Sequence, residues 1–325
     1  MPDRIAIVTT SYPTHPGDAS GHFVAAEARA LAAAGHRVTV ITGGTQPPRA
    51  GCPEIVRLAD GGATGWPGLV PRLSQDRLRW LGLARWVLSA RRELGRRGPF
   101  DRVVAHWMLP AACPVALLAE LRGARLDVVV HGSDARLLAR LPAGLGRGVV
   151  GALSRRGARF RCVSPELARI VEQLGGAARH PIRVEASPIE LGAPRTRRSA
   201  RAALGVPDAT RLIVIAGRMI PEKRTSVALA AASLVAGAEI VALGDGPELE
   251  PLRAAFPRVR FCGRLDRAAA LDWIAAADVV LSASRDEGSP SVVREARALG
   301  VPVVAVSAGD LPSAAVHDSG LFLVR

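Results

Sequence analysis

Short apolar runs alternate along the chain with stretches of helical composition, and Gly- or Pro-containing loops separate them. The apolar runs predict strands at Arg4–Thr10, Arg37–Thr42, Arg102–Trp107, Asp127–His131, Phe160–Ser164, Arg211–Gly217, Glu239–Gly244, Val259–Cys262, Val279–Ser284 and Val301–Val306. Helices are predicted near Gly21–Ala34, Asp76–Arg96, Ala111–Arg122 and Pro165–Leu174, and between the later strands. Such alternation is typical of right-handed crossovers that build an open parallel sheet.

The alternation forms two blocks, joined by the basic, Pro-containing stretch Ser187–Ser199. We therefore expect an α/β protein of two Rossmann-like parallel-sheet domains, residues 1–190 and 191–325, facing across a cleft. Ligands in such sheets bind beyond the carboxyl ends of the strands. The unusual residues of this chain fall almost entirely at those ends.

Composition agrees with helices packed on parallel sheets. Apolar residues make up 49% of the 325 residues, but aromatic residues only 4%, so we expect cores of Ala, Val and Leu. The four cysteines lie far apart and form no Cys-x-x-Cys pair, which argues against a disulfide framework or a metal site. The N-terminus enters a strand at once and no apolar run approaches a membrane span, so a soluble, cytoplasmic protein is expected.

Positive charge is concentrated in the first half. Residues 1–195 contain 27 arginines against 15 acids, whereas residues 196–325 contain 16 cations against 14 acids. Much of the excess lies between Trp66 and Pro99, where arginines alternate with Leu, Val and Trp. This pattern favours a surface that meets anionic lipid at the inner face of the membrane, or an anionic acceptor. A merely solvated basic helix is the alternative; nucleic acid is not expected, because no binding motif accompanies the charge.

Two glutamates near the end of the chain, Glu287 and Glu295, stand eight positions apart in a strand–loop–helix pattern. One carboxylate should lie at the mouth of the loop and the other two turns into the helix. The helix N-terminus between them suits an anion, and carboxylates accept hydrogen bonds from hydroxyls. Hydroxyl acceptors on both sides of an anion site suit a nucleotide sugar.

A single lysine, Lys223, stands among 43 lysines and arginines. It follows the apolar run that ends at Ala216. Lysine and arginine are not interchangeable where a compact ammonium must fit beside a phosphate. Chance survival on a helix surface is the alternative, but beside the glutamate pair we favour a functional lysine.

Loops at other strand ends carry further candidates. The first loop ends in Gly21 at a helix start, and another strand ends in His131-Gly132-Ser133-Asp134. In the second half, Gly244-Asp245-Gly246-Pro247 superficially suggests a dinucleotide fingerprint, but the third glycine and the acidic ribose partner are missing.

Taken in order, these motifs resemble those of family-4 glycosyltransferases of the GT-B fold. The matching segments are the first loop with Gly35–Val40, His131–Asp134, Val163–Glu166, Gly217-Arg218 with Lys223, Gly244–Pro247, Phe261–Gly263, and Glu287-x7-Glu295 with Ala298–Ala305. The resemblance implies that the second domain holds a nucleotide-activated sugar, UDP- or GDP-linked, and the first domain holds an acceptor such as a lipid, a glycan or a small molecule. It also implies transfer with retention of configuration, without a metal or other cofactor.

The resemblance assigns roles to individual residues. Arg218 and Lys223 would neutralise the departing diphosphate, Glu287 would accept from hydroxyls of the transferred sugar, and His131 would orient that sugar. Glu295 would accept from the ribose hydroxyls. The remaining expected substrate contacts are Gly21, Asp134, Gly244, Gly263, Arg264, Leu265, Gly288, Ser289, Pro290 and Ser291.

The chain differs from this family pattern in two places. The first loop has Ser20-Gly21 where many members have Gly-Gly, and the sequence given stops at Arg325, before the helices that usually return to the first domain. We therefore expect a second domain that is shorter than usual. A nucleotide-sugar epimerase of the same fold and a non-catalytic nucleotide-sugar-binding subunit remain alternatives to a transferase.

Overall fold

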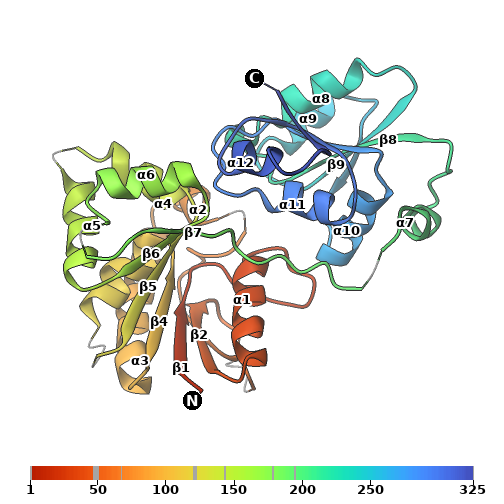
Figure 1. Ribbon diagram of the computed structural model, residues 1–325. Coiled ribbons are helices and arrows are strands. Elements are labelled where there is room, and N and C mark those ends of the chain that lie inside the picture. Colours follow the sequence, from red (N-terminus) through yellow and green to blue (C-terminus); the bar gives the residue numbers. More distant parts are fainter. Residues whose placement is uncertain are drawn as a thin grey trace. The chain divides into compact units, whose positions relative to one another are not determined.

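A computed structural model of the chain describes residues 2–46, 51–66, 68–119, 123–142, 144–177, 179–193 and 195–324. The contacts divide the chain into two compact units, residues 1–188 and 189–325 (Figure 1). Each unit is built around its own sheet, and all strand pairs in both sheets are parallel. Within the described residues, every helix falls short of the length and apolar character that crossing a membrane needs.

The first unit contains a seven-stranded sheet with the order β3-β2-β1-β4-β5-β6-β7. Its strands are β1 (Arg4–Val8), β2 (Arg37–Gly43), β3 (Glu54–Leu58), β4 (Arg102–His106), β5 (Arg125–Val130), β6 (Arg159–Cys162) and β7 (Arg183–Val184). Its helices are α1 (His22–Ala33), α2 (Leu69–Gln75), α3 (Arg79–Arg97), the irregular η1 (Met108–Ala116), α4 (Ser133–Arg140), α5 (Leu145–Arg155) and α6 (Pro165–Gln173). Figure 1 shows α1 on one face of this sheet and α3 and α5 on the other.

The second unit contains a six-stranded sheet with the order β10-β9-β8-β11-β12-β13. Its strands are β8 (Arg211–Ala216), β9 (Ala238–Leu243), β10 (Arg260–Gly263), β11 (Val279–Ser282), β12 (Val303–Val306) and β13 (Leu321–Val324). Its helices are α7 (Arg197–Leu204), the short 3₁₀ helix η2 (Pro221–Lys223), α8 (Thr225–Ser233), α9 (Leu249–Ala255), α10 (Arg267–Ala276), α11 (Ser291–Ala298) and α12 (Leu311–Ala315).

Both faces of the second sheet are covered, which explains why its central strands are continuously apolar. Along β8, Leu212 and Val214 belong to one buried cluster, whereas Ile213 and Ile215 belong to another. Successive strand side chains point to opposite faces, so the two clusters lie on the two sides of the sheet. A strand buried on both sides must end in a loop before polar residues can reach the surface, and these loops carry the candidate site.

All ten predicted strands are present, and the two-sheet α/β architecture is confirmed. Two helix predictions in the first unit were wrong in detail. The helix predicted at Asp76–Arg96 begins at Arg79, after the separate helix α2. The helix predicted at Ala111–Arg122 is replaced by η1, in which the backbone of Leu109 and Cys113 is extended; residues 120–122 lie outside the described residues.

Several elements were not predicted: β3, β7, β13, α2, α4, α5, α7 and α12. Strand β3 has only three apolar residues within Glu54–Leu58, and β7 has only two residues, both exposed, so their apolar signal is weak. Helix α7 begins inside the stretch expected to join the domains, because Thr196 and Ser199 cap it reciprocally.

Candidate functional site

Three neighbouring strands of the second unit end in glycines that lie directly against one another. The amide of Gly244 donates to the carbonyl of Gly263 at 2.8 Å, and the amide of Gly217 donates to Leu243 at 2.9 Å. Gly244 has a φ of +130°, and a Cβ atom added to it would lie 1.8 Å from the carbonyl oxygen of Gly217. A side chain at Gly244 would collide with Gly217, so the glycine lets the loops after β8 and β9 pack directly on each other. This is the carboxyl edge of the sheet, where ligands of such sheets bind.

The loop after β8 brings Arg218 and Lys223 to the same edge. Lys223 ends η2, and its Nζ donates to Oε1 of Glu287 in an ion pair that joins the loops after β8 and β11. Both side chains are mostly buried, 24% and 14% exposed respectively. Burial lowers the pKa of the Arg218 guanidinium, and the charges of Glu287 and Glu222 act against this shift. The structure therefore gathers three of the four residues expected to act in catalysis.

The carboxyl group of Glu287 is held in its charged form. Burial alone would raise its pKa, but the charge and hydrogen bond of Lys223 lower it, as do a hydrogen bond from Ser284 and the charge of Arg218. The net effect is a pKa below the ordinary glutamate value. At neutral pH this group is a carboxylate, which accepts hydrogen bonds.

The loop from β11 to α11 is fixed by the loop that follows β12. The carbonyl of Gly288 accepts a hydrogen bond from the amide of Asp310 at 2.9 Å, and Ser289 donates to Oδ2 of Asp310 at 2.5 Å. Pro290 stands at the N-cap of α11, whose first residue is Ser291, and no side chain caps this end. Peptide N–H groups in the first turn of a helix need partners, so this terminus can receive an anion.

Glu295 lies within α11 and is almost completely buried. Its Oε1 atom accepts from Nη1 of Arg267 at 2.8 Å, and Nη2 of Arg267 donates to the carbonyl of Glu190 at 2.6 Å. The structure thus gives Glu295 a protein partner that the sequence did not reveal. Its contact with a ribose stays a prediction.

The two other predicted residues of this unit, Arg264 and Leu265, follow β10. Leu265 is partly buried against the core, and Arg264 is exposed beside Gly263 at the same strand end. Of the predicted residues of the second unit, Gly263 is the last residue of β10 and Glu295 lies within α11. The others lie on loops, short helical turns or helix starts that follow the strands.

In the first unit, Gly21 is required by the path of the first loop. Its φ is +64°, and an added Cβ would lie 2.2 Å from the carbonyl oxygen of Ser11. The loop is shaped by Asp18, which accepts from the amides of Thr14 and Ser20, both at 2.9 Å. Although burial raises its pKa, these hydrogen bonds lower it to about 2. Gly21 thus lets the loop close over the start of α1.

His131 follows β5 and belongs to a small cluster of rings. Its ring centroid lies 4.7 Å from that of Trp107 and 4.9 Å from that of Phe23. Its Nε2 atom lies 3.0 Å from Nδ1 of His106, which ends β4 and is fully buried. Trp107 has a φ of 72°, a conformation that is costly for a residue with a Cβ atom.

Asp134 has a structural role that the sequence did not suggest. It is buried in the first turn of α4, where Oδ2 accepts from the amide of Met108 at 2.6 Å and Oδ1 accepts from Gly132 at 3.2 Å. Burial raises its pKa in spite of these hydrogen bonds. These contacts tie α4 to the turn after β4, and substrate binding by Asp134 stays a prediction.

The two histidines are expected to make the protein less stable in mild acid. Burial, with the charge of Arg161, holds the pKa of both His106 and His131 well below the ordinary value. Below about pH 6.5 the unfolded chain therefore binds protons that the folded chain does not, so the free energy of unfolding should fall by up to roughly 1.4 kcal/mol per histidine per pH unit. Urea unfolding at pH 7, 6 and 5.5 measures this. A His106→Gln variant should show a shallower fall, and a flat profile for the unaltered chain would contradict the expectation.

Both parts of the chain match sequence models of known glycosyltransferase families. Residues 20–191 match the sequence model of Glycosyltransferase Family 4, and residues 210–325 match that of Glycosyl transferases group 1. The chain belongs to Glycosyltransferase Family 4. It is also 28% identical over 247 residues to TuaC from Bacillus subtilis (strain 168), provisionally named a teichuronic acid biosynthesis glycosyltransferase. That match covers 74% of this chain and 62% of TuaC.

Solved structures share the fold of this family 4 chain. Sucrose-phosphate synthase from Thermosynechococcus elongatus has a TM-score of 0.80 at 20% identity, over 99% of this chain and 86% of the other. The Anabaena protein HepE in complex with UDP-glucose has a TM-score of 0.67 at 18% identity, over 99% of this chain and 85% of the other. These likenesses confirm the GT-B fold expected from the sequence.

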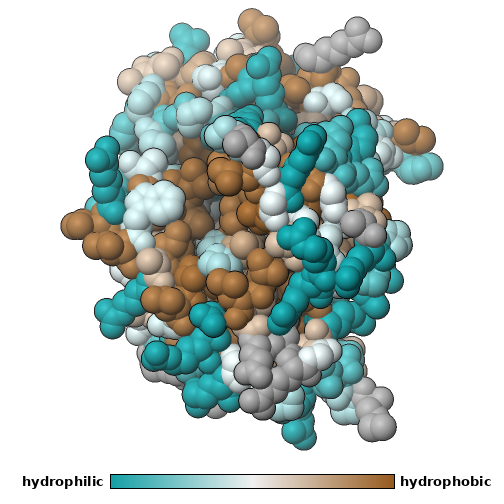
Figure 2. Space-filling model, turned by 90° about the vertical axis from the view of Figure 1, so that its left-hand side faces the viewer, coloured by the Kyte–Doolittle hydropathy of each residue, from teal (hydrophilic) through white to brown (hydrophobic). Residues whose placement is uncertain are grey.

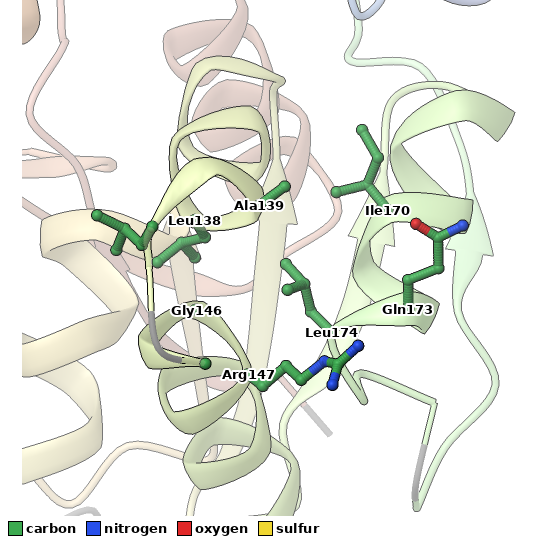
Figure 3. A pocket seen from close by; sticks show the side chains of 9 residues that line it. Leu138, Ala139, Gly146, Arg147, Ile170, Gln173 and Leu174 are labelled. Atoms are coloured by element: carbon green, nitrogen blue, oxygen red, sulfur yellow. The ribbon is translucent and has the colours of Figure 1, made fainter.

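A cavity of about 300 Å³ lies elsewhere in the family 4 chain, between α4, α5 and α6 (Figure 3). Arg147 and Gln173 are the lining residues with polar side chains, and the lining surface as a whole is more polar than apolar. The lining residues are Leu138, Ala139, Leu141, Gly144, Gly146, Arg147, Ile170, Gln173 and Leu174. None of the predicted site residues is among them, so this cavity is separate from the strand-end site.

Sequence inspection missed several residues of the candidate strand-end site. Asp310 holds Ser289, and within the described residues its other oxygen, Oδ1, is buried without a hydrogen-bond partner. Gly309, at a φ of +59°, lets Asp310 approach, because an added Cβ would lie 2.1 Å from the carbonyl of Gly288. The signal available was a Gly-Asp pair in the loop that follows a predicted strand. No comparable signal marks Arg267 or Glu27, which lie within helices.

Proposed function

We propose that this chain transfers a sugar from a nucleotide-diphosphate sugar to an acceptor hydroxyl, with retention of configuration and without a metal ion. The observation that carries the proposal is the Lys223–Glu287 ion pair beside Arg218, at the glycine-lined carboxyl edge of the second sheet. In this proposal the two cations would meet the departing diphosphate, and the carboxylate would accept hydrogen bonds from sugar hydroxyls. Family membership supports the same chemistry.

The cations explain how the reaction would proceed without a metal. As the glycosidic bond breaks, negative charge grows on the diphosphate. Fixed positive groups in a poorly hydrated site stabilise such charge strongly. Arg218 and Lys223 supply these groups, while Glu287 keeps the ammonium in place. His131, a residue of the first unit, would orient the transferred sugar.

A nucleotide sugar is the best supported donor. HepE, which shares the fold, has been solved with UDP-glucose. For this chain we propose a UDP- or GDP-sugar, and an acceptor that is lipid-linked, a glycan or a small molecule.

One experiment tests the function directly. Melting temperatures are measured with UDP-, GDP-, ADP- and dTDP-sugars, because a ligand that binds only the folded state stabilises it. The stabilising donor is then incubated with acceptor extracts in EDTA, and the linkage of the product is determined.

Retained configuration and full activity in EDTA are expected. Activity that returns only with Mg²⁺ or Mn²⁺ would overturn the metal-free mechanism. Conversion of the donor without acceptor would favour an epimerase, and binding without turnover a non-catalytic subunit.

Replacing Glu295 by alanine is expected to weaken donor binding by roughly 1.5–3 kcal/mol, because the ribose hydroxyls would lose a charged acceptor. Calorimetry with the donor measures the change. An Arg267→Gln variant is the control, since it breaks the same ion pair but keeps the carboxylate. An unchanged dissociation constant for Glu295→Ala, or an equal loss in both variants, would remove Glu295 from the ribose site.

We also propose that the first unit binds the anionic inner surface of a membrane. Helices α3 and α5 both pack on η1, and α2 packs on α3, so these elements cover the same side of the sheet. They contain one arginine in α2, six in α3 and two in α5, but a single acid, Glu93, which is ion-paired with Arg96 and Arg97. A layer with so little negative charge is suited to anionic lipid.

The same layer exposes large apolar side chains. Those that are more than half exposed are Val70, Leu78, Trp80, Leu81, Leu88, Leu118 and Leu145. Leu118 lies beside Arg91, whose Nε donates to its carbonyl at 3.0 Å. Figure 2, which looks onto the side of this unit that carries α5, shows apolar side chains gathered within a hydrophilic border. Apolar groups that enter the interface, flanked by cations, are typical of peripheral membrane proteins.

Vesicle binding should depend on both charge and apolar contact. Replacing Arg77, Arg85 and Arg92 by glutamine should weaken co-sedimentation with anionic vesicles roughly 100-fold, at about 1 kcal/mol for each charge. Salt should release the unaltered protein as the Debye length falls below about 10 Å.

A Trp80→Ser/Leu81→Ser/Leu88→Ser variant should also lose binding. The matched control changes three exposed apolar residues of the second unit, in the variant Leu234→Ser/Val235→Ser/Val316→Ser. This control should bind the vesicles as the unaltered protein does. Equal recovery with neutral vesicles, or none with either, would leave only a solvated basic surface.

A further inference from the structure

A buried chain of polar side chains extends behind His131. The Nε2 atom of His131 faces Nδ1 of His106 at 3.0 Å, with the two ring planes 13° apart. On its other side, Nε2 of His106 lies 3.7 Å from Oε2 of Glu27 in α1. Glu27 is in turn ion-paired with Arg161 of β6. Four side chains from α1, β4, β5 and β6 thus form one connected series inside the first unit.

The short contact between the two histidines has room for one proton. Both rings are neutral, since burial and the charge of Arg161 hold their pKa values well below the ordinary value. A neutral imidazole has one N–H donor and one bare acceptor nitrogen. Either His106 donates from Nδ1 and His131 carries its own proton on Nδ1, or His131 donates from Nε2 and its Nδ1 is bare. The two arrangements present opposite hydrogen-bonding groups at Nδ1 of His131.

Glu27 decides between these arrangements. The nitrogen of His106 that faces Glu27 is fully buried, where electrostatic effects are stronger than in water. A carboxylate oxygen 3.7 Å away attracts an N–H dipole and repels a lone pair, although it is too distant for a normal hydrogen bond. Arg161 bonds the same oxygen and its charge opposes a further proton on His106, but the oxygen of Glu27 is the atom that faces Nε2. The proton of His106 is therefore favoured on Nε2, so its Nδ1 is bare and must accept from His131.

We propose that Glu27 and His106 are positioning residues that fix His131 as the Nε2–H tautomer, so that its Nδ1 accepts a hydrogen bond from a hydroxyl of the transferred sugar. The assignment of a sugar hydroxyl rests on the proposed function, whereas the tautomer itself does not. In the described part of the chain, the fold engages His131 through Nε2, and Nδ1 has no protein hydrogen bond. The rings of Phe23 and Trp107 flank the imidazole and restrict its rotation.

This arrangement suits the charge that develops during transfer. The sugar gains positive character at its reacting carbon as the diphosphate departs, in an oxocarbenium-like transition state. An imidazolium there would oppose that charge. A neutral ring that accepts from a hydroxyl leaves electron density on the sugar. The buried series thus keeps His131 both neutral and oriented as an acceptor.

Nitrogen NMR of the full-length, ¹⁵N-labelled protein without ligand tests the tautomer directly. Long-range ¹H–¹⁵N correlations distinguish a bare ring nitrogen from an N–H, and the His131 signals are those that disappear in His131→Asn. The expected result is a bare Nδ1 and a protonated Nε2, unchanged between pH 6 and 8. A protonated Nδ1 in the unaltered protein would overturn the proposal without any variant being made.

Two variants at Glu27 separate positioning from simple stability. Glu27→Leu removes the carboxylate and leaves the charge of Arg161 beside His106, so the proton should shift and Nδ1 of His131 should become an N–H. Glu27→Asp keeps the carboxylate and should retain the original tautomer. If Glu27→Leu does not fold, Glu27→Leu/Arg161→Leu removes both charges and should give a mixture of tautomers. An unchanged tautomer in every variant without the carboxylate would overturn the role of Glu27.

Measurements of kcat and KM then test whether the tautomer of His131 affects sugar transfer. Glu27→Leu should lower kcat about 10- to 100-fold, the usual effect of losing a residue that orients a functional side chain, with KM for the donor less affected. Glu27→Asp, which keeps the carboxylate, should retain more of the original rate than Glu27→Leu does. A switched tautomer with an unaltered kcat would overturn the hydrogen bond to the sugar. No transfer by the unaltered protein would instead refute the proposed function, and the NMR result would stand alone.

Discussion

Replacing Lys223 by arginine is expected to slow sugar transfer by roughly 10²–10³-fold while donor binding stays nearly normal. The side chain of Lys223 is partly buried, and its methylene groups lie beside Gly217. Its ammonium is paired with Glu287. Arginine keeps the charge, but it moves it outward and spreads it over a planar group. An interaction that strengthens only in the transition state is lost from kcat and not from KM. Initial rates over a range of donor concentrations measure both constants.

The structure sharpens the design of this experiment. Lys223→Ala should lower kcat further and should also weaken donor binding. It leaves the carboxylate of Glu287 buried without its partner, and loss of one member of such a pair typically destabilises a protein by roughly 3–5 kcal/mol. Lys223→Arg avoids that complication. Arg253→Lys is the control, since it exchanges the same residue types at an exposed ion pair with Glu250. Full speed for Lys223→Arg would mean that the lone lysine survived by chance.

Replacing Gly244 by alanine is expected to destabilise the second unit by roughly 2–6 kcal/mol. The added Cβ would lie 1.8 Å from the carbonyl oxygen of Gly217, and the φ of +130° is strained for any residue with a side chain. Crowding and backbone strain each cost roughly 1–3 kcal/mol. Relief of the clash would move the loop that carries Arg218 and Lys223, so activity should fall as well. Urea unfolding and transfer rates measure the two effects.

A second glycine provides the matched control. Gly237, in the same unit, also has a positive φ, +71°, but nothing lies within 4 Å of an added Cβ. Gly237→Ala should therefore cost only the strain of the left-handed conformation, roughly 1–2 kcal/mol, and leave activity intact. If both variants lose equal stability, backbone strain alone explains the effect, and close contact between the loops after β8 and β9 is not required.

The sequence by itself determined the two-sheet architecture and the edge at which the site lies. Strands buried on both faces must be continuously apolar, as in Leu212–Ile215, and crossovers between parallel strands must be long enough to hold a helix. Both features are local in the chain. Candidate residues such as Gly244, Lys223 and Glu287 could be found because they interrupt that local pattern directly after a strand.

Only the tertiary structure decided which charges meet. Lys223 and Glu287 are 64 residues apart, and Arg161 and Glu27 are 134 apart. Glu295 was expected to meet a ribose, yet Arg267 already bonds it, and Asp134 was expected at the substrate but holds backbone amides. Such partners depend on the order of strands in the sheet and on the directions of individual side chains. Periodicity along the chain reports whether a residue is buried, but it carries no information about which distant residue lies opposite.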